Sequence, residues 1–218
     1  MRQFKVIDLS IRMVPGVRKV SGEYRHGELT RRLEIRQFLY REQAGAMASM
    51  HWIDAESHIG THVEGPSHFK EELQAVGEMP LETFMGEAVL LRFVEPRPVN
   101  GVGQPIKPEH LERVRGGDIV LMWSPYEGAD KPYVSPEAAR ALFEKRVKLV
   151  GFDMSRVGVE APGCFATHEN LLGNGIPVIE GLTNLEALEK ERFFFVALPI
   201  RIAGLDSSWI RAVALEPL

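Results

Sequence analysis

The segment Ser57–Phe69 has the sequence Ser-His-Ile-Gly-Thr-His-Val-Glu-Gly-Pro-Ser-His-Phe. It contains three of the chain's seven histidines, His58, His62 and His68, and an acid, Glu64, two residues after the second of them. Imidazole and carboxylate groups are the ligands that suit Zn²⁺, Mn²⁺ or Fe²⁺ in catalytic sites. The spacing therefore predicts a metal site, although it does not by itself identify a reaction.

The glycines and the proline of this segment exclude a regular helix. In an extended chain, side chains two residues apart project to the same side, so His62 and Glu64 are expected to face one site. Gly60 has no side chain, which lets the backbone bend so that the histidines before and after it converge. Just upstream, Asp54 and Glu56 are candidate acceptors for the free N–H group of a ligand.

Alternating and continuous apolar runs around this segment predict a mixed α/β fold. The clearest helix begins at Ser135, an N-cap serine followed by a proline in the first turn. Strands are expected at residues 4–10, 32–41, 46–54, 87–95, 117–123, 147–153, 176–179, 193–199 and 209–215, and helical segments at 108–114, 135–145, 166–172 and 184–189. The 193–199 strand is expected to be fully buried. The prediction is a single domain, residues 1–218, with a central curved, barrel-like mixed β-sheet flanked by helices.

Composition excludes several classes of protein. The chain has 218 residues, 44% of them hydrophobic, which is enough for one core. A net charge of −4 with interspersed signs provides no basic surface for nucleic acid or anionic lipid. The one cysteine, Cys164, cannot form an intrachain disulfide, and neither a signal peptide nor a membrane span is recognisable. A cytoplasmic protein without a nucleic-acid or membrane partner is expected.

The segment Ser57–Phe69 resembles the signature His-x-Gly-Thr-His-x-Asp-x-Pro-x-His of the cyclase/kynurenine-formamidase-like superfamily of metal-dependent hydrolases, which includes isatin-hydrolase-like enzymes. Six of the seven fixed positions match. The block Thr167–Leu185 is similar to a later segment of the family, with a histidine, an apolar strand, and a glutamate followed by Leu-x-Asn-Leu. The opening Val6–Ser10 and the strand at 117–121 also fit, so the resemblance spans nearly the whole chain.

The resemblance implies a barrel-like α/β fold and hydrolysis of amides, lactams or esters of small molecules. It implies one or two divalent ions per chain, usually zinc or manganese, and a homo-oligomer such as a dimer or tetramer. Residue by residue, the matching positions imply metal ligands at His58, His62 and Glu64, ligands of a second ion at His168 and Glu180, and a proton-transfer histidine at His68.

Two departures from the family pattern limit what the resemblance implies. Glu64 stands where the family usually has aspartate, which makes a bridging role and the metal preference less secure. The N-terminal stretch also lacks the tryptophan expected of kynurenine formamidases, because the tryptophans are Trp52, Trp123 and Trp209. This argues against N-formylkynurenine as the substrate.

Several alternatives stay open at this point. A metal-binding regulatory or binding protein without turnover, or a metal-dependent lyase or dehydratase, would use the same ligands. Thr61 has two interpretations, either a contact to ligand or substrate or a hydroxyl that caps the local turn. The remaining histidines, His26, His51 and His110, are expected to be structural or exposed to solvent.

Overall fold

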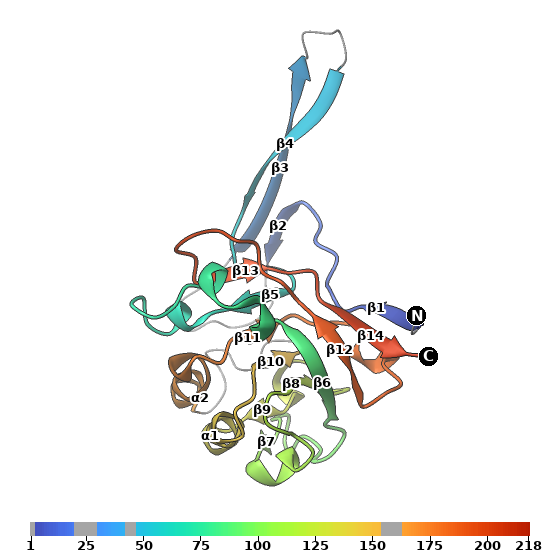
Figure 1. Ribbon diagram of the computed structural model, residues 1–218, viewed down its shortest axis with the longest axis vertical. Helices are drawn as coiled ribbons and strands as arrows, with labels where there is room; N and C mark the ends of the chain where they lie inside the picture. The colour runs from blue at the N-terminus through green and yellow to red at the C-terminus, as the bar shows by residue number, and fades with distance from the viewer. Residues whose placement is uncertain (1–2, 20–29, 42–46, 154–162) are drawn as a thin grey trace.

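The computed structural model describes residues 3–19, 30–41, 47–153 and 163–218 (Figure 1). The strands in chain order are β1 (Phe4–Asp8), β2 (Gly16–Lys19), β3 (Thr30–Arg41), β4 (Met47–Ala55), β5 (His62–Glu64), β6 (Met85–Arg92), β7 (Pro105–Ile106), β8 (Ile119–Trp123), β9 (Tyr133–Val134), β10 (Leu149–Phe152), β11 (Val178–Glu180), β12 (Arg192–Val196), β13 (Ser207–Trp209) and β14 (Val213–Pro217). The α-helices are α1 (Pro136–Glu144) and α2 (Cys164–Leu171). Short 3-10 helices lie at Pro66–His68, Val76–Glu78, Leu81–Thr83, Pro108–Leu111, Gly128–Asp130, Leu172–Asn174 and Leu185–Ala187.

Nine strands form one mixed sheet in the order β1-β14-β12-β6-β8-β10-β11-β5-β13. The central strands β6, β8, β10 and β11 are parallel, and the strands on either side of them pair antiparallel. The sheet must curl, because β13 and β14 lie seven positions apart in it but only Ile210–Ala212 separates them in the chain. Seven strand spacings span about 34 Å in a flat sheet, whereas four residue steps reach at most about 14 Å.

Side-chain alternation divides the core into two layers. On β8, Ile119 and Leu121 belong to the cluster inside the curl, which also contains Phe84 and Phe195. Val120 and Met122 face the other way, toward the cluster that includes residues of α1 and α2. The central strands are therefore buried on both faces, which is why they read as continuous apolar runs.

The helices cover the outer face of the parallel strands, where α1 and α2 pack side by side (Figure 1). The hydroxyl of Ser135 accepts a hydrogen bond from the backbone N–H of Ala138, as expected for an N-cap serine. The predicted fold class, an α/β fold around a curved, barrel-like mixed sheet flanked by helices, is confirmed.

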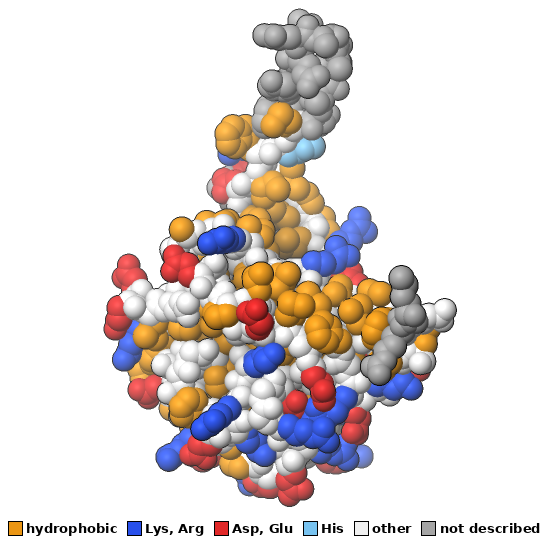
Figure 2. All heavy atoms as spheres, viewed as in Figure 1, with side chains coloured by type: hydrophobic (Ala, Val, Ile, Leu, Met, Phe, Trp, Pro, Cys, Tyr) orange, Lys and Arg blue, Asp and Glu red, His pale blue; other side chains and the backbone are white. Residues whose placement is uncertain are grey.

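Strands β3 and β4 form a long antiparallel hairpin that projects from the body, with β2 paired along its base (Figure 1). We call the described part of β3 and β4 the arm. It exposes apolar side chains on both faces, since Ile35 and Ile53 oppose each other on one face and Met50 and Trp52 lie on the other. In the view of Figure 2, hydrophobic side chains are exposed along the arm. The predicted pairing of residues 32–41 with 46–54 is confirmed.

Three expectations drawn from the sequence are wrong in detail. Residues 209–215 do not form one strand, because β13 lies at one edge of the sheet and β14 lies next to the other edge. The chain between them crosses the gap where the two edges of the curled sheet face each other, which we call the seam. The strand at β12 is not fully buried: Phe193 and Phe195 are, whereas Phe194 points to the opposite face and is 39% exposed. Residues 108–114 form one short 3-10 helix, Pro108–Leu111, because Gly116 and Gly117 follow before β8 begins.

In the part of the chain that the structure describes, no helix is long and apolar enough to cross a membrane.

Candidate functional site

Strand β5 carries two of the predicted ligands on one face. Val63, between them, is fully buried in the interior cluster, so His62 and Glu64 face the opposite side, toward the helices. Strand β11 pairs with β5 so that Glu180 is opposite His62, and the Oε2 atom of Glu180 lies 3.8 Å from Nε2 of His62. The expectation that His62 and Glu64 project to the same side of the strand is therefore confirmed. Strand pairing brings Glu180 next to His62.

Two glycines let the chain approach this face closely. Gly60 has a φ angle of +64°, a left-handed conformation that favours glycine, and its carbonyl oxygen lies 3.1 Å from Nδ1 of His62. A side chain at Gly181 would lie 2.5 Å from the same carbonyl oxygen, and Gly181 also has a positive φ of +71°. The loops before β5 and after β11 therefore pack backbone to backbone, which brings His62 and Glu180 together.

The backbone contact of His62 determines which nitrogen is available. Its Nδ1–H donates to the carbonyl of Gly60, so Nε2 is left with its lone pair. Within the described part of the chain, that Nε2 atom and the Oε2 atom of Glu64 are both buried and have no hydrogen-bond partner. Buried polar atoms without a partner are rare in native proteins, and a bound cation would satisfy both atoms.

His58 and His68 complete a group around Glu64. His58 lies in the loop before β5, and its Nδ1 atom is 2.9 Å from Oε1 of Glu64. His68 lies in the short 3-10 helix Pro66–His68, with Nε2 3.7 Å from the same oxygen. The ligand atoms of His58, His62 and Glu64 all lie within 4.8 Å of one another, as a shared ion requires.

The donor set fits a divalent cation. Two imidazoles and a carboxylate are a common ligand combination for catalytic zinc or manganese. Burial would raise the pKa of Glu64, but hydrogen bonding to His58 and the charge of nearby histidines lower the pKa of this carboxyl well below its usual value. Glu64 is therefore ionised, which a metal ligand must be.

His168 lies on α2, at the more open side of the group. Its ring centre is 6.4 Å from that of His68, and its Nδ1 is 2.8 Å from the carbonyl oxygen of Cys164 one turn earlier in the helix. This contact leaves Nε2 of His168 with a lone pair, as for His62. Among the described residues, His168 and Glu180 lie outside the tight groups of ligand atoms, so their role as ligands of a second ion stays a prediction.

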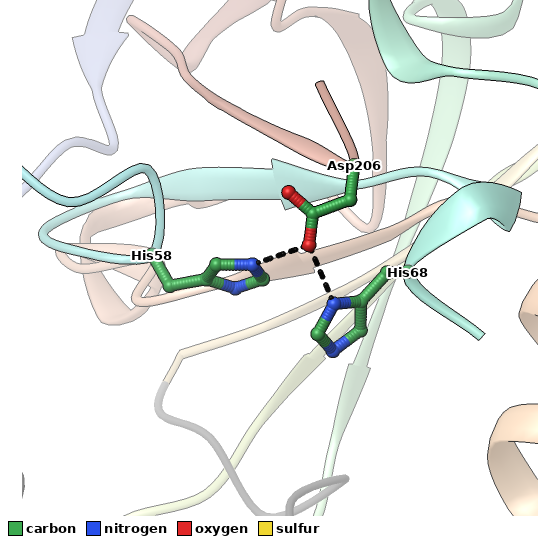
Figure 3. Close-up of side chains that lie close together, drawn as sticks. All are labelled: His58, His68 and Asp206. Atoms are coloured by element: carbon green, nitrogen blue, oxygen red, sulfur yellow. Dashed lines mark hydrogen bonds and ion pairs between the residues drawn. The ribbon is translucent and has the colours of Figure 1, made fainter. Parts of the chain in front are cut away.

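Sequence reasoning missed Asp206. Its Oδ2 atom lies 2.9 Å from Nε2 of His58 and 2.8 Å from Nδ1 of His68 (Figure 3). Burial would raise the pKa of Asp206, but the hydrogen bonds from the two histidines outweigh it and lower the pKa of this carboxyl. For His58, burial lowers the pKa, and the hydrogen bonds to Glu64 and Asp206 raise it above its usual value.

The other described residues considered from the sequence make structural hydrogen bonds or are exposed to solvent. The hydroxyl of Thr61 donates to the carbonyl of Gly181 and accepts from the backbone N–H of Ile11. It therefore links segments that are distant in the sequence and does not cap the local turn. His110 accepts from the backbone N–H of Lys107, and His51 is exposed on the arm. His26 lies outside the described residues.

The two acids upstream of the segment, Asp54 and Glu56, have contacts away from the ligand group. A carboxylate oxygen of Asp54 lies 3.8 Å from a guanidinium nitrogen of Arg36 on the arm. The backbone oxygen of Glu56 accepts a hydrogen bond from the indole N–H of Trp209. These contacts do not support the expectation that either carboxylate orients a metal ligand. Besides Glu64, the acid that contacts His58 is Asp206.

Comparisons with known sequences identify the family of this chain. The model of the Cyclase family matches residues 7–159. The chain is 32% identical over 166 residues to a kynurenine formamidase from Salinibacter ruber (strain DSM 13855 / M31), an alignment that covers 72% of this chain and 75% of the relative.

Solved structures have the same fold. Isatin hydrolase A from Labrenzia aggregata, bound to benzyl benzoate, superposes with a TM-score of 0.80 at 22% identity, over 99% of this chain and 94% of that one. A structure from Bacillus stearothermophilus described as a predicted metal-dependent hydrolase superposes with a TM-score of 0.70 at 25% identity, over 98% of both chains.

Proposed function

Because this chain belongs to the Cyclase family, we propose that it is a hydrolase that cleaves a C–N bond other than a peptide bond in a small molecule. The kynurenine formamidase among its relatives supports an amide substrate, and the isatin hydrolases that share its fold support a lactam. An ester is a third substrate of the same chemical class, since its carbonyl is attacked in the same way.

One observation supports metal dependence most directly: Nε2 of His62 and Oε2 of Glu64 are both buried and have no hydrogen-bond partner among the residues that the structure describes. We assign His58, His62 and Glu64 as ligands of one zinc or manganese ion, and His168 with Glu180 as ligands of a second ion where two are bound. An ion held there polarises the scissile carbonyl and makes a water molecule more acidic.

His68 is placed to move the proton. It is the most exposed of the three histidines around Glu64, and its Nε2 atom lies 3.7 Å from Oε1 of Glu64. A neutral imidazole can take a proton from the attacking water on Nε2 and then give it to the leaving nitrogen, which departs as a neutral amine. His68 is therefore the proposed catalytic residue.

Hydrolysis by reconstituted protein tests this function. Protein stripped with a chelator is reloaded with zinc or with manganese and assayed with an aryl formamide, isatin and an aryl ester. We expect metal-dependent hydrolysis of at least one of them. His68→Ala should keep its metal and lose about 10²- to 10⁴-fold in kcat, the usual contribution of general acid–base catalysis. His110→Ala, a change of the same kind at a histidine outside the ligand group and away from the arm, should match the wild type.

Three results would contradict the proposal. Unchanged hydrolysis in His68→Ala would exclude the assigned role of that histidine. Metal uptake without hydrolysis of any substrate would favour a binding protein of the same fold. Elimination of water from a substrate, in place of its addition, would identify a lyase or dehydratase.

We also propose that the protein is a cytoplasmic homo-oligomer, a dimer or tetramer, without a nucleic-acid or membrane partner. A two-stranded hairpin is marginally stable alone in water, yet the arm exposes Trp52 and Ile53, which are 66% and 59% exposed. A second copy that covers the arm would bury them. Light scattering should give a multiple of the chain mass for the wild type and a smaller species for Trp52→Ser/Ile53→Ser, with Val99→Ser as the control. A monomeric wild type would contradict the assembly.

A further inference from the structure

Asp206 connects the metal-ligand group to the proposed proton carrier. A single oxygen of its carboxylate, Oδ2, lies within hydrogen-bond distance of Nε2 of His58 and of Nδ1 of His68 (Figure 3). The two histidines lie on either side of β5 in the chain: His58 lies in the loop before this strand, and His68 lies in the 3-10 helix after it. Their rings are 4.6 Å apart at the centres.

The backbone fixes where this carboxylate lies. Strand β13 pairs antiparallel with β5 so that Ser207 is opposite Glu64. One residue earlier, the carbonyl of Asp206 accepts a hydrogen bond of 2.7 Å from the N–H of Gly65. The hydroxyl of Ser207 lies 3.3 Å from Oδ1 of Asp206, the oxygen that the histidines do not use. The bond to Gly65 and the pairing of Ser207 with Glu64 thus hold Asp206 beside the end of the strand that carries the ligands.

An ionised carboxylate accepts hydrogen bonds and cannot donate them. Both ring nitrogens that face Asp206 must therefore carry the proton. In His58, Nδ1 lies 2.9 Å from Oε1 of Glu64 and donates a hydrogen bond to it. Because Asp206 holds the proton on Nε2, Nδ1 is the nitrogen that would lose its proton and bind a cation. In His68, a proton on Nδ1 leaves the lone pair on Nε2, the atom that faces Glu64.

We propose that Asp206 is a positioning residue that selects the tautomers of both histidines. It orients His58 as a ligand through Nδ1 and His68 as a proton acceptor through Nε2. This inference rests on the proposed function, because it assigns the two rings the roles of ligand and proton carrier. The arrangement in which a carboxylate accepts from the second nitrogen of a ligating histidine is common around metal sites, where such carboxylates tune the ligand.

The tautomer of His68 tests the proposal without relying on activity. Two-bond ¹H–¹⁵N correlation spectra of the zinc-loaded protein report which ring nitrogen carries the proton. We expect the proton on Nδ1 in the wild type and in Asp206→Asn, because the amide oxygen can still accept. In Asp206→Ala we expect the proton on Nε2 of His68. Asp206 is only partly buried, so the alanine variant is expected to fold.

Kinetics and metal content supply the second measurement. Asp206→Ala should lose about 10- to 100-fold in kcat or in zinc affinity, with KM little changed, and Asp206→Asn should lose less. Asp206→Glu should restore part of the loss because it keeps the carboxylate. Glu186→Ala, a change of an exposed acid far from the site, is the control.

Two outcomes would overturn the proposal. His68 with its proton on Nε2 in the wild type, or on Nδ1 in Asp206→Ala, would show that Asp206 does not select the tautomer. Loss of one equivalent of zinc in Asp206→Ala would show that Asp206 binds an ion directly together with His58 and His68. Failure of the proposed function is recognised separately, since a wild type that hydrolyses nothing still reports the tautomer of His68.

Discussion

Glu180 of β11 lies directly opposite His62 of β5, and its carboxylate is 3.8 Å from Nε2 of that histidine. The carboxylate of Glu64 lies 3.6 Å from the same nitrogen. All three residues are at most 6% exposed. Burying two carboxylates beside one imidazole is costly unless positive charge compensates them. A bound divalent cation would provide that charge.

The length of the side chain at residue 64 should affect metal binding. Glu64→Gln keeps the size and removes the charge, so zinc affinity should fall by more than the 10- to 100-fold typical of changes to outer-shell partners. Glu64→Asp keeps the charge but moves it back by about 1.5 Å, one C–C bond, and should cause a smaller loss. Competition titrations with a coloured chelator measure both. Equal affinity in wild type and Glu64→Gln would exclude Glu64 as a ligand.

Gly181→Ala should loosen the contact between the loops before β5 and after β11. Its φ of +71° disfavours alanine, and the new Cβ would lie 2.5 Å from the carbonyl oxygen of Gly60. We expect a loss of about 1–3 kcal/mol in the free energy of unfolding and weaker metal binding. Gly204 has a similar φ of +76° but open space around it. Gly204→Ala should therefore lose only the stability that alanine costs at a positive φ. Equal losses in the two variants in urea titrations would contradict the close contact.

The seam of the curled sheet has a pH-dependent ion pair. Arg211 donates two hydrogen bonds, of 2.9 and 2.6 Å, to the carboxylate of Asp8. The hydrogen bonds from Arg211 lower the pKa of Asp8, and burial of the carboxylate partly opposes this shift. A lowered pKa stabilises the fold above the ordinary pKa of aspartate, and this contribution is lost as the pH falls through the folded-state value.

Arg211→Gln should therefore raise the pKa of Asp8, which carboxyl ¹³C NMR measures directly. It should also reduce the free energy of unfolding at neutral pH and have no effect at a pH below the folded-state pKa of Asp8. Arg201→Gln, at another exposed arginine, is the control. A pKa of Asp8 that does not move in Arg211→Gln would show that the pair does not form in solution.

Alternate side chains of β12 should differ strongly in their contribution to stability. Phe195 is completely buried inside the curl, and Phe194 is 39% exposed on the other face. Phe195→Ala should cost about 3–5 kcal/mol in the free energy of unfolding, as for other buried aromatic residues. Phe194→Ala should cost clearly less. Urea unfolding of both variants tests the register of β12, and similar costs would contradict it.

The local part of the site could be predicted because its residues are close in the sequence. The spacing of His58, His62, Glu64 and His68 is visible within eleven positions. The period-2 pattern of β5 also correctly placed His62 and Glu64 on one side. His168 and Glu180 gave no comparable local signal, and only the resemblance to a family pointed to them.

Asp206 could not be predicted in this way. It is 138 residues from His68 in the sequence and has no other metal-ligating residue beside it, so only the pairing of β13 with β5 reveals its role. The break between β13 and β14 was missed for a related reason. Residues 209–215 alternate like one strand, and the need to cross the seam of a curled sheet does not appear in a local pattern.

Metal content is the most direct test of the central claim, that His58, His62 and Glu64 hold a catalytic ion. Protein stripped with a chelator, reloaded with zinc or manganese and freed of excess ion is analysed for metal per chain. We predict one or two equivalents in the wild type and in the His110→Ala control, and the loss of at least one equivalent in His62→Ala. No uptake by the wild type, or full uptake by a folded His62→Ala variant, would contradict the account.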